Sequence, residues 1–368
     1  MSSHDVVSLG ATKEHPFAAP NSSPPRLTPT ISRSIEQRTT TPYSPAAIEH
    51  VASPDRMLVA VLPASPKSAQ ETIRALLEAD QLTAPVHVRA IYRDVAKAPA
   101  EFVSHGSFHA VAGDLSNAAS LDLGNADTVF AITPPRYDGS DMMQWARQAS
   151  ENTRIAIQKA GTVKRLVLLS SMGAEQPEGT GEIMTNHIAE EILKDVVPEV
   201  VFMRCAYFME NWAPAMETVQ AKQPHLFSVI TPLDYEIPMW LNHSRCKVSV
   251  ADIGKACATY IMAMDNPKNP YVVEVHGPRE YTAKDVQEAF QDVAGHAVEL
   301  RPIEKADLPA FFGRFLPEAS VGPFVEMTRS FLPGGVIAKE SGNSPSPDRM
   351  YRGRTELVDA IRRLFRKG

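Results

Sequence analysis

The chain has 368 residues, of which 43% are hydrophobic, and its formal net charge is -6. This length suffices for one large domain or two coupled domains with a real core. The mildly acidic balance argues against nucleic acid and anionic membranes as partners, and no apolar run approaches the roughly 18 residues of a membrane helix. Three cysteines, Cys205, Cys246 and Cys257, lack paired metal-ligand spacing and fit a reducing compartment. We therefore expect a cytoplasmic protein without a metal site.

The first 54 residues differ in composition from the rest of the chain. They contain eight of the 30 prolines, mixed with serine and threonine. Such a segment buries too little apolar surface to offset the entropy cost of ordering. The sequence predicts a disordered tail over residues 1–54.

From Met57 onward, strand-like and helix-like segments alternate. Strands are predicted over residues 57–62, 86–94, 108–114, 128–133, 163–171 and 199–206, and helices over residues 69–80, 140–161 and 181–195. Ser140 is expected to begin the long middle helix and Gly161 to end it. This alternation predicts a doubly wound α/β fold with a parallel sheet. Ligands of such sheets bind at the carboxyl ends of the strands, where the strand order reverses.

The second half of the chain is less regular. Residues 207–248 are rich in Pro, Trp and Met. Helices are predicted over residues 249–265, 282–296 and 355–368, with a strand over 271–278. The pairs Ser249 with Asp252 and Thr282 with Asp285 have the spacing of capping boxes.

The turn PASPKSA, residues 63–69, stands where many α/β proteins have a glycine-rich phosphate loop. Ser65 and Ser68 offer hydroxyl groups, Lys67 offers positive charge, and the following helix N-terminus offers free N–H groups. An ordinary strand-to-helix turn remains the alternative. Arg93, after the second strand, suits a 2′-phosphate better than a free ribose hydroxyl, unless it is simply a solvated arginine.

Six segments then occur in an order typical of one family: AVAGDLSNAASL, TVFAITPP, KRLVLLSSMGA, NHIAEEIL, RCAYFMENW and KVSVADIGKA. Together they resemble the NmrA-like family of atypical short-chain dehydrogenase/reductases, and fungal members in particular. The resemblance covers residues from about 57 to about 301. It implies a Rossmann-type NAD(P)-binding domain over residues 55–206. A small C-terminal α/β substrate lobe would occupy residues 207–368, with some segments returning to the sheet.

The resemblance also implies NADP(H) as cofactor and assigns residues to it by position. The expected cofactor-binding residues are Ser65, Lys67, Ser68, Arg93, Asp114, Leu115, Thr133, Pro134, Ser170, Ser171, Met172, Tyr207 and Phe208. Asn211 would lie where family members meet the nicotinamide and the substrate. Trp212, Tyr235 and Trp240 are candidates for an apolar substrate wall, with simple packing as the alternative.

One feature of the family pattern is missing. Short-chain dehydrogenases use a Tyr–Lys pair four residues apart, but NHIAEEIL has no tyrosine and places Ile188 at the usual lysine position. His187, one helical turn before Glu191, is the nearest side chain suited to proton transfer, and Glu191 is expected to orient it. Tyr137, in the loop after the fourth strand, is the second catalytic candidate. Either residue could instead be structural.

Three functions remain open from the sequence. The first is an NADP(H)-dependent oxidoreductase acting on a bulky apolar secondary metabolite. The second is a cofactor-bound cyclase or isomerase without redox chemistry. The third is a non-catalytic NADP(H) redox sensor. In each case the partners would be small molecules, and the protein would be a monomer or homodimer.

Overall fold

The structure is a computed structural model that describes residues 57–80, 86–235, 247–263, 269–339 and 349–367. The predicted tail, residues 1–54, lies outside the described residues, as do Trp240 and Cys246.

The centre of the fold is an eight-stranded sheet in which every pair of neighbouring strands is parallel. Its strand order is β12-β10-β6-β5-β4-β1-β2-β3. The strands are β1 (Met57–Leu62), β2 (Val86–Tyr92), β3 (Phe108–Ala112), β4 (Thr128–Ile132), β5 (Arg165–Ser171), β6 (Glu199–Cys205), β10 (Tyr271–His276) and β12 (Met350–Arg352). The order reverses between β1 and β4, so a crevice for ligands is expected at their carboxyl ends. The predicted doubly wound α/β fold is confirmed.

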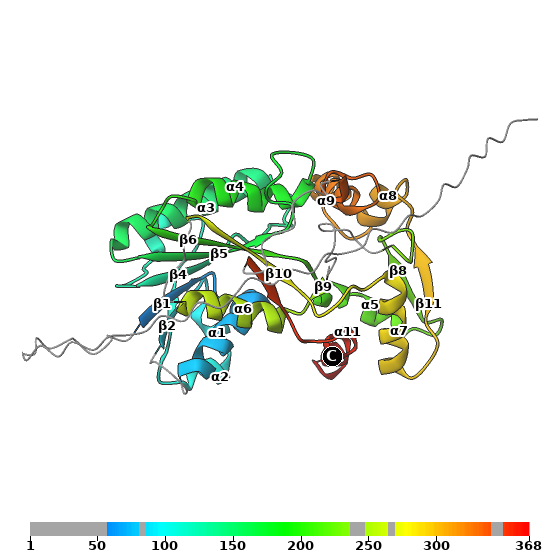
Figure 1. The fold of residues 1–368 in the computed structure, drawn as a ribbon, viewed down its shortest axis with the longest axis horizontal. Helices are drawn as coiled ribbons and strands as arrows, with labels where there is room; N and C mark the ends of the chain where they lie inside the picture. Colours follow the sequence, from blue (N-terminus) through cyan, green and yellow to red (C-terminus); the bar gives the residue numbers. More distant parts are fainter. Residues whose placement is uncertain (1–56, 81–85, 236–246, 264–268, 340–348, 368) are drawn as a thin grey trace, which may run out of the picture. The chain divides into compact units, whose positions relative to one another are not determined.

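Helices cover both faces of this sheet (Figure 1). On one face lie α3 (Met142–Ala160) and α4 (Met184–Leu193), and on the other lie α1 (Lys67–Asp80), α2 (Ala100–Val103) and α6 (Val250–Met262). Alternate residues of β1 serve the two faces: Val59 and Val61 belong to one apolar core, and Ala60 and Leu62 to the other. Burial on both sides explains why the strand segments read as continuous apolar runs.

The closest helix pairing on the α1 face depends on Gly254 of α6. A Cβ atom at Gly254 would lie 2.4 Å from the backbone carbon of Glu71 on α1. Only glycine therefore allows the two helix backbones to approach this closely.

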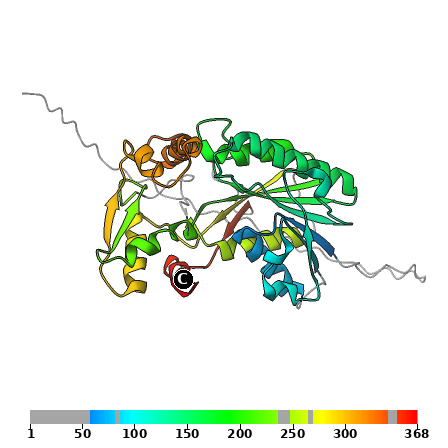
Figure 2. The same cartoon turned by 180° about the vertical axis from the view of Figure 1, so that it is seen from behind.

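A second group of elements lies beyond the sheet (Figure 2). It contains two small parallel sheets, β7 (Tyr207–Phe208) with β9 (Lys247–Val248) and β8 (His225–Ser228) with β11 (Glu299–Pro302). Its helices are α5 (Ala215–Val219), α7 (Ala283–Ala294), α8 (Leu308–Phe312), α9 (Glu318–Phe331), α10 (Val336–Lys339) and α11 (Leu357–Lys367). The strands β10 and β12 from this half of the sequence return to the central sheet.

The ends of α3 and α7 correct one sequence expectation and confirm two. Asp141, rather than Ser140, caps α3: its Oδ1 accepts hydrogen bonds from the backbone N–H groups of Met143 and Gln144. Gly161 ends α3 in the left-handed conformation, as expected. The capping box of Thr282 and Asp285 is present at the start of α7.

The expected capping box of Ser249 and Asp252 is wrong. Ser249 caps α6 by accepting from Ala251 N. The Asp252 carboxylate instead accepts from the backbone N–H groups of Arg354 (2.9 Å) and Thr355 (2.7 Å). The spacing of a capping box was satisfied, but a distant segment provides more N–H donors to this buried carboxylate.

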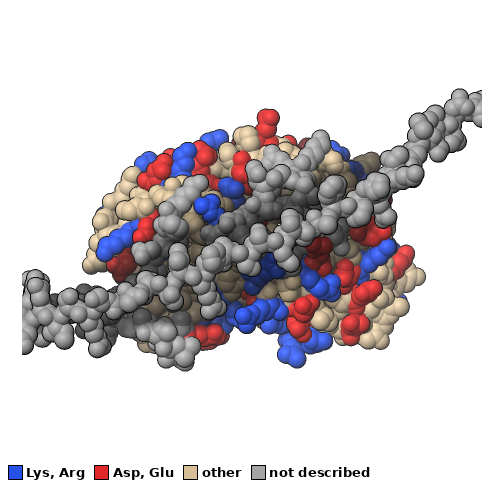
Figure 3. All heavy atoms as spheres, viewed as in Figure 1, with Lys and Arg blue, Asp and Glu red and all other residues tan. Residues whose placement is uncertain are grey.

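Acidic and basic side chains are interspersed over the face shown in Figure 3. Where described residues are visible on this face, no broad area has a single charge sign that would attract a polyanion. Within the described ranges, no helix combines the length and the apolar character required to span a membrane.

Candidate cofactor and substrate site

The residues assigned to the cofactor come together at one edge of the sheet. All of them lie at or just beyond the carboxyl ends of β1 to β6, and parallel strands bring those ends to the same edge. The crevice at the reversal between β1 and β4 is flanked by the loops that carry Ser65 and Thr133.

The PASPKSA turn presents a helix N-terminus to this edge. Ala64 N donates to Ile91 O over 2.9 Å, which ties the turn to β2. The first helical hydrogen bond of α1 runs from Gln70 N to Pro66 O (3.0 Å), so the N–H groups of Lys67 and Ser68 precede it. The side chains of Ser65 and Lys67 are exposed, whereas Ser68 is buried. N–H groups that precede the first helical hydrogen bond, beside a lysine, fit the pyrophosphate of a dinucleotide.

Positive charge gathers next to this turn, around Asp114. Burial alone would raise the pKa of Asp114, but hydrogen bonds from Ser116 and the nearby charges of Arg93 and Arg136 lower it below the usual value. Arg93 is exposed. The neighbouring Asp94 is occupied as the cap of η1 (Val95–Lys97), where it accepts from Ala96 N. Of these two residues after β2, Arg93 is thus the one whose side chain is available to the ribose of a cofactor. Its positive charge fits a 2′-phosphate.

The loop after β4 is fixed by Trp145 of α3. Trp145 Nε1 donates to Pro134 O over 2.8 Å, and the Arg136 guanidinium lies 4.0 Å from the centroid of the Trp145 ring. The Thr133 hydroxyl lies 3.4 Å from the hydroxyl of buried Ser150. Next to this loop, Leu115 is buried and its carbonyl accepts from Asn152 Nδ2 (2.7 Å).

The serines at the end of β5 point in different directions. Ser170 Oγ donates to Glu190 Oε1 of α4 over 2.6 Å, and Glu190 pairs with Arg204 of β6 at 2.6 Å. The Ser170 hydroxyl therefore belongs to a buried polar network with Glu190 and Arg204. Ser171 is half-buried, its hydroxyl donates to the carbonyl of Met172 (3.0 Å), and Met172 itself is buried.

Tyr137 is paired with an acidic residue that the sequence did not suggest. Its hydroxyl donates to Glu182 Oε1 over 2.5 Å. Glu182 lies in η3 (Gly181–Ile183), directly before α4. The Tyr137 ring also meets Phe324 of α9 edge to face, with centroids 5.5 Å apart.

His187 has a different partner from the one expected. Its Nδ1 lies 2.8 Å from the carbonyl oxygen of Ala174, which can only accept, so Nδ1 carries the proton. Glu191 pairs with Lys194 at 2.8 Å, and the pKa of Glu191 is lowered chiefly by Lys194 and to a lesser degree by His187, so its role towards His187 stays a prediction. The ring is half-buried, and Ile188 beside it is buried.

The helix α9 provides an aromatic wall. Phe331 meets the ring of Tyr207 at a centroid distance of 6.3 Å, and its carbonyl accepts from the Tyr235 hydroxyl at 3.2 Å. Burial raises the pKa of Tyr207 to about 12, although a hydrogen bond with Asn211 opposes that shift. Tyr207 thus remains protonated at neutral pH.

The other substrate candidates vary in accessibility. Asn211 is exposed, Phe208 is half-buried, and Trp212 is buried. The Trp212 indole N–H finds no hydrogen-bond partner among the described residues. Trp240 lies outside the described residues.

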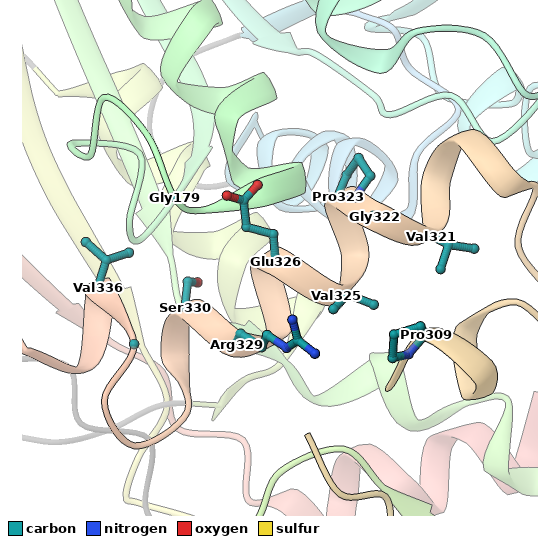
Figure 4. Close-up of a pocket in the computed structure, with 11 residues that line it drawn as sticks. Gly179, Pro309, Val321, Gly322, Pro323, Val325, Glu326, Arg329, Ser330 and Val336 are labelled. Atoms are coloured by element: carbon teal, nitrogen blue, oxygen red, sulfur yellow. The ribbon is translucent and has the colours of Figure 1, made fainter. Parts of the chain in front are cut away.

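A separate groove of about 680 Å³ runs along α9 (Figure 4). Val325 and Arg329 of α9 line it on the side of Pro309, while Glu326 extends towards Gly179. None of the residues predicted from the sequence is among its described lining residues. Over the same described ranges, no group of three or more His, Cys, Asp and Glu side chains is placed to hold a metal ion.

Four residues of the site were missed by the sequence analysis: Arg136, Glu182, Phe324 and Phe331. Arg136 stands next to Tyr137 in PPRYDGS, so its charge was a readable signal. Glu182, Phe324 and Phe331 carry no local signal, because each becomes relevant only through a contact with a distant loop.

Comparison with known proteins concerns the fold and one segment of the sequence. Residues 64–200 match the sequence model of a family described as NAD(P)H-binding. No curated protein sequence matches the chain. Among solved structures, the NADPH-dependent quinone oxidoreductase of Escherichia coli, complexed with NADPH, is similar with a TM-score of 0.61 and 18% identity. That match covers 84% of this chain and 100% of the other.

Two further structures show the same fold. Triphenylmethane reductase of Citrobacter sp., complexed with NADP(H), has a TM-score of 0.60 and 16% identity, over 83% of this chain and 99% of the other. A nucleoside-diphosphate-sugar epimerase of Staphylococcus aureus has a TM-score of 0.61 and 15% identity, with 83% and 99% covered. The chain thus has the fold of these proteins. Within it, residues 64–200 match the family described as NAD(P)H-binding.

Proposed function

We propose that this protein is an NADP(H)-dependent oxidoreductase of the NmrA-like type that acts on a bulky, apolar secondary metabolite. One observation carries the proposal: two side chains able to give a proton, Tyr137 and His187, flank the strand ends of the NAD(P)H-binding segment. The bound nicotinamide would supply the hydride, and the protein would supply orientation and a proton.

The charge around the adenosine side favours NADPH over NADH. Arg93 and Arg136 both act on Asp114, and Asp94 is occupied by its cap. A guanidinium group can hold a 2′-phosphate through two parallel hydrogen bonds, which a ribose hydroxyl cannot exploit.

The wall formed by α9 favours an apolar, aromatic substrate. Phe324 and Phe331 present rings towards Tyr137 and Tyr207, and Asn211 adds an exposed polar group nearby. Pockets of this kind hold a ligand by apolar area and orient it by a few polar groups. Quinones and triphenylmethane dyes, the substrates named for two proteins of this fold, are suitable first probes.

The test is a reductase assay that follows cofactor and product separately. Purified protein with NADPH is given a panel of quinones, triphenylmethane dyes and aromatic ketones. We expect NADPH to be consumed in proportion to the reduced product. Product without any change in NADPH would instead indicate a cyclase or isomerase, and tight NADPH binding without turnover on any acceptor would indicate a sensor.

A further inference from the structure

Tyr137 and Glu182 form a side-chain pair across two loops at the carboxyl edge of the sheet. Tyr137 lies in the loop after β4, and Glu182 lies between β5 and α4. The Tyr137 hydroxyl and Glu182 Oε1 are 2.5 Å apart. Since β4 and β5 are neighbours in the sheet, the pair bridges adjacent strand ends.

Both loops are held in place by other contacts. The Tyr137 loop is anchored through Pro134 to Trp145. On the other side, Thr185 Oγ1 donates to the backbone carbonyl of Glu182 over 2.8 Å. Gly181 lies against α9 so closely that a Cβ atom would be 2.0 Å from Pro323 O. The hydrogen bond therefore joins two preorganised groups.

The surroundings of this pair raise the pKa of both groups. Burial raises the pKa of Glu182, although the hydrogen bond from Tyr137 opposes that shift. Burial also raises the pKa of Tyr137, although the residue is 44% exposed. The parts of α9 that face the pair, Pro323 and Phe324, are not titratable. Glu326 and Arg329, the charged residues of α9 at the groove, line it together with Gly179.

We propose that Tyr137 donates the proton in the reduction, and that Glu182 is a positioning residue that holds Tyr137 and replaces its proton. This inference rests on the proposed reductase function. The cofactor would supply a hydride with its electron pair to the acceptor, and Tyr137 would give its hydroxyl proton to the negatively charged oxygen that results. The phenolate oxygen then takes the proton of the Glu182 carboxylic acid. The Glu182 carboxylate regains a proton from water.

This arrangement defines the class of acceptor that benefits from the pair. Reduction of a quinone or a ketone needs a hydride and a proton. Reduction of a cationic triphenylmethane dye needs only a hydride, because the hydride neutralises the carbocation. The Tyr137–Glu182 pair should therefore accelerate the reduction of carbonyl acceptors and have little effect on the reduction of the dye.

The first experiment compares one quinone and one cationic triphenylmethane dye in wild type, Tyr137→Phe and Glu182→Gln. Exposed Glu178, in the same loop as Glu182, supplies the control Glu178→Gln. We expect Tyr137→Phe to slow quinone reduction about 100-fold and Glu182→Gln at least about tenfold, with dye reduction within about twofold of wild type. Equal losses on both acceptors would mean that the pair only shapes the site, and would overturn the proposal.

His187 is the competing donor and receives the same assay. If His187→Gln slows quinone reduction selectively while Tyr137→Phe does not, the proton comes from His187 and the proposal is wrong. We expect the opposite pattern, because His187 Nδ1 is hydrogen-bonded to a backbone carbonyl, which cannot replace a donated proton, whereas Tyr137 is hydrogen-bonded to a carboxyl group, which can.

A second readout needs no turnover. Infrared difference titration of the NADP⁺-bound protein should show a carboxylic acid band that persists above the usual pKa of glutamate and is absent in Glu182→Gln. If Glu182 is already ionised near pH 5, it cannot supply a proton to Tyr137 at neutral pH, and this part of the proposal is wrong. A wild type that binds NADPH but reduces no acceptor contradicts the reductase function alone, because the infrared result still decides the protonation of Glu182.

Discussion

The hydroxyl of Tyr235 donates to the carbonyl oxygen of Phe331 over 3.2 Å. Tyr207 contacts the ring of the same phenylalanine, and seven residues earlier Phe324 contacts Tyr137. Residues seven apart lie on one face of a helix, so a single face of α9 meets all three tyrosines. The helix α9 thus holds together three segments that are far apart in the sequence.

Arg93→Ala should reduce the affinity for NADPH selectively. A two-pronged arginine–phosphate contact is worth about 1.5–3 kcal/mol, which corresponds to a loss of about 10- to 150-fold in affinity. NADH affinity should change little, because NADH has no 2′-phosphate. Calorimetric titration with both cofactors measures this, and Lys97→Ala, which removes an exposed charge nearby, is the matched control. An unchanged preference for NADPH in Arg93→Ala would exclude Arg93 from the phosphate site.

Lys67→Ala should weaken NADPH and NADH by the same factor. Lys67 begins α1 beside the N–H groups expected to hold the pyrophosphate, which both cofactors share. Lys159→Ala, at an exposed position in the last turn of α3, controls for the change in net charge. If Lys67→Ala lowers the affinity for only one cofactor, or for neither, the PASPKSA turn does not bind the pyrophosphate and only connects β1 to α1.

Gly181→Ala should destabilise the protein more than Gly139→Ala. Both glycines have positive φ, 56° and 86°, so alanine is strained at either site by about 1 kcal/mol. At Gly139 nothing lies within 4 Å of the added Cβ, whereas at Gly181 the carbonyl oxygen of Pro323 is 2.0 Å away. Urea unfolding should show a further loss of about 1–3 kcal/mol for Gly181→Ala. If Gly181→Ala and Gly139→Ala lower the free energy of unfolding by the same amount, η3 and α9 can move apart without a loss of stability.

Asp252→Ala should cost more stability than Ser249→Ala. Ser249 supplies a single helix cap, worth about 1 kcal/mol. Asp252 is buried and accepts two backbone N–H groups, so its loss should cost about 3 kcal/mol. Thermal unfolding gives the order, and hydrogen exchange should accelerate at Arg354 and Thr355. If the amides of Arg354 and Thr355 remain protected from exchange in Asp252→Ala, the Asp252 carboxylate does not hold these residues against α6.

The parts that could be predicted from sequence are those governed by local patterns. Buried parallel strands read as apolar runs, as in β1, and caps such as Thr282 with Asp285 depend on neighbours in the sequence. The parts that could not be predicted depend on long-range contacts. Asp252 matched a local motif but bonds to Thr355, and Glu182 shows its relation to Tyr137 only after two strands are placed side by side.

The short strand β12 has a consequence for the synthesis of the protein. It lies at one edge of the central sheet and pairs with β10, whose residues are translated nearly eighty residues earlier. Ribosomes add about 5–20 residues per second, so one edge of β10 stays unpaired for several seconds during synthesis. During the same period, the Asp252 carboxylate lacks the N–H groups of Arg354 and Thr355. The nascent chain therefore passes through a stage at which its nearly finished sheet can pair with another copy. A translational pause or a stop before residue 350 would prolong that stage, and such products should be prone to aggregation or chaperone capture.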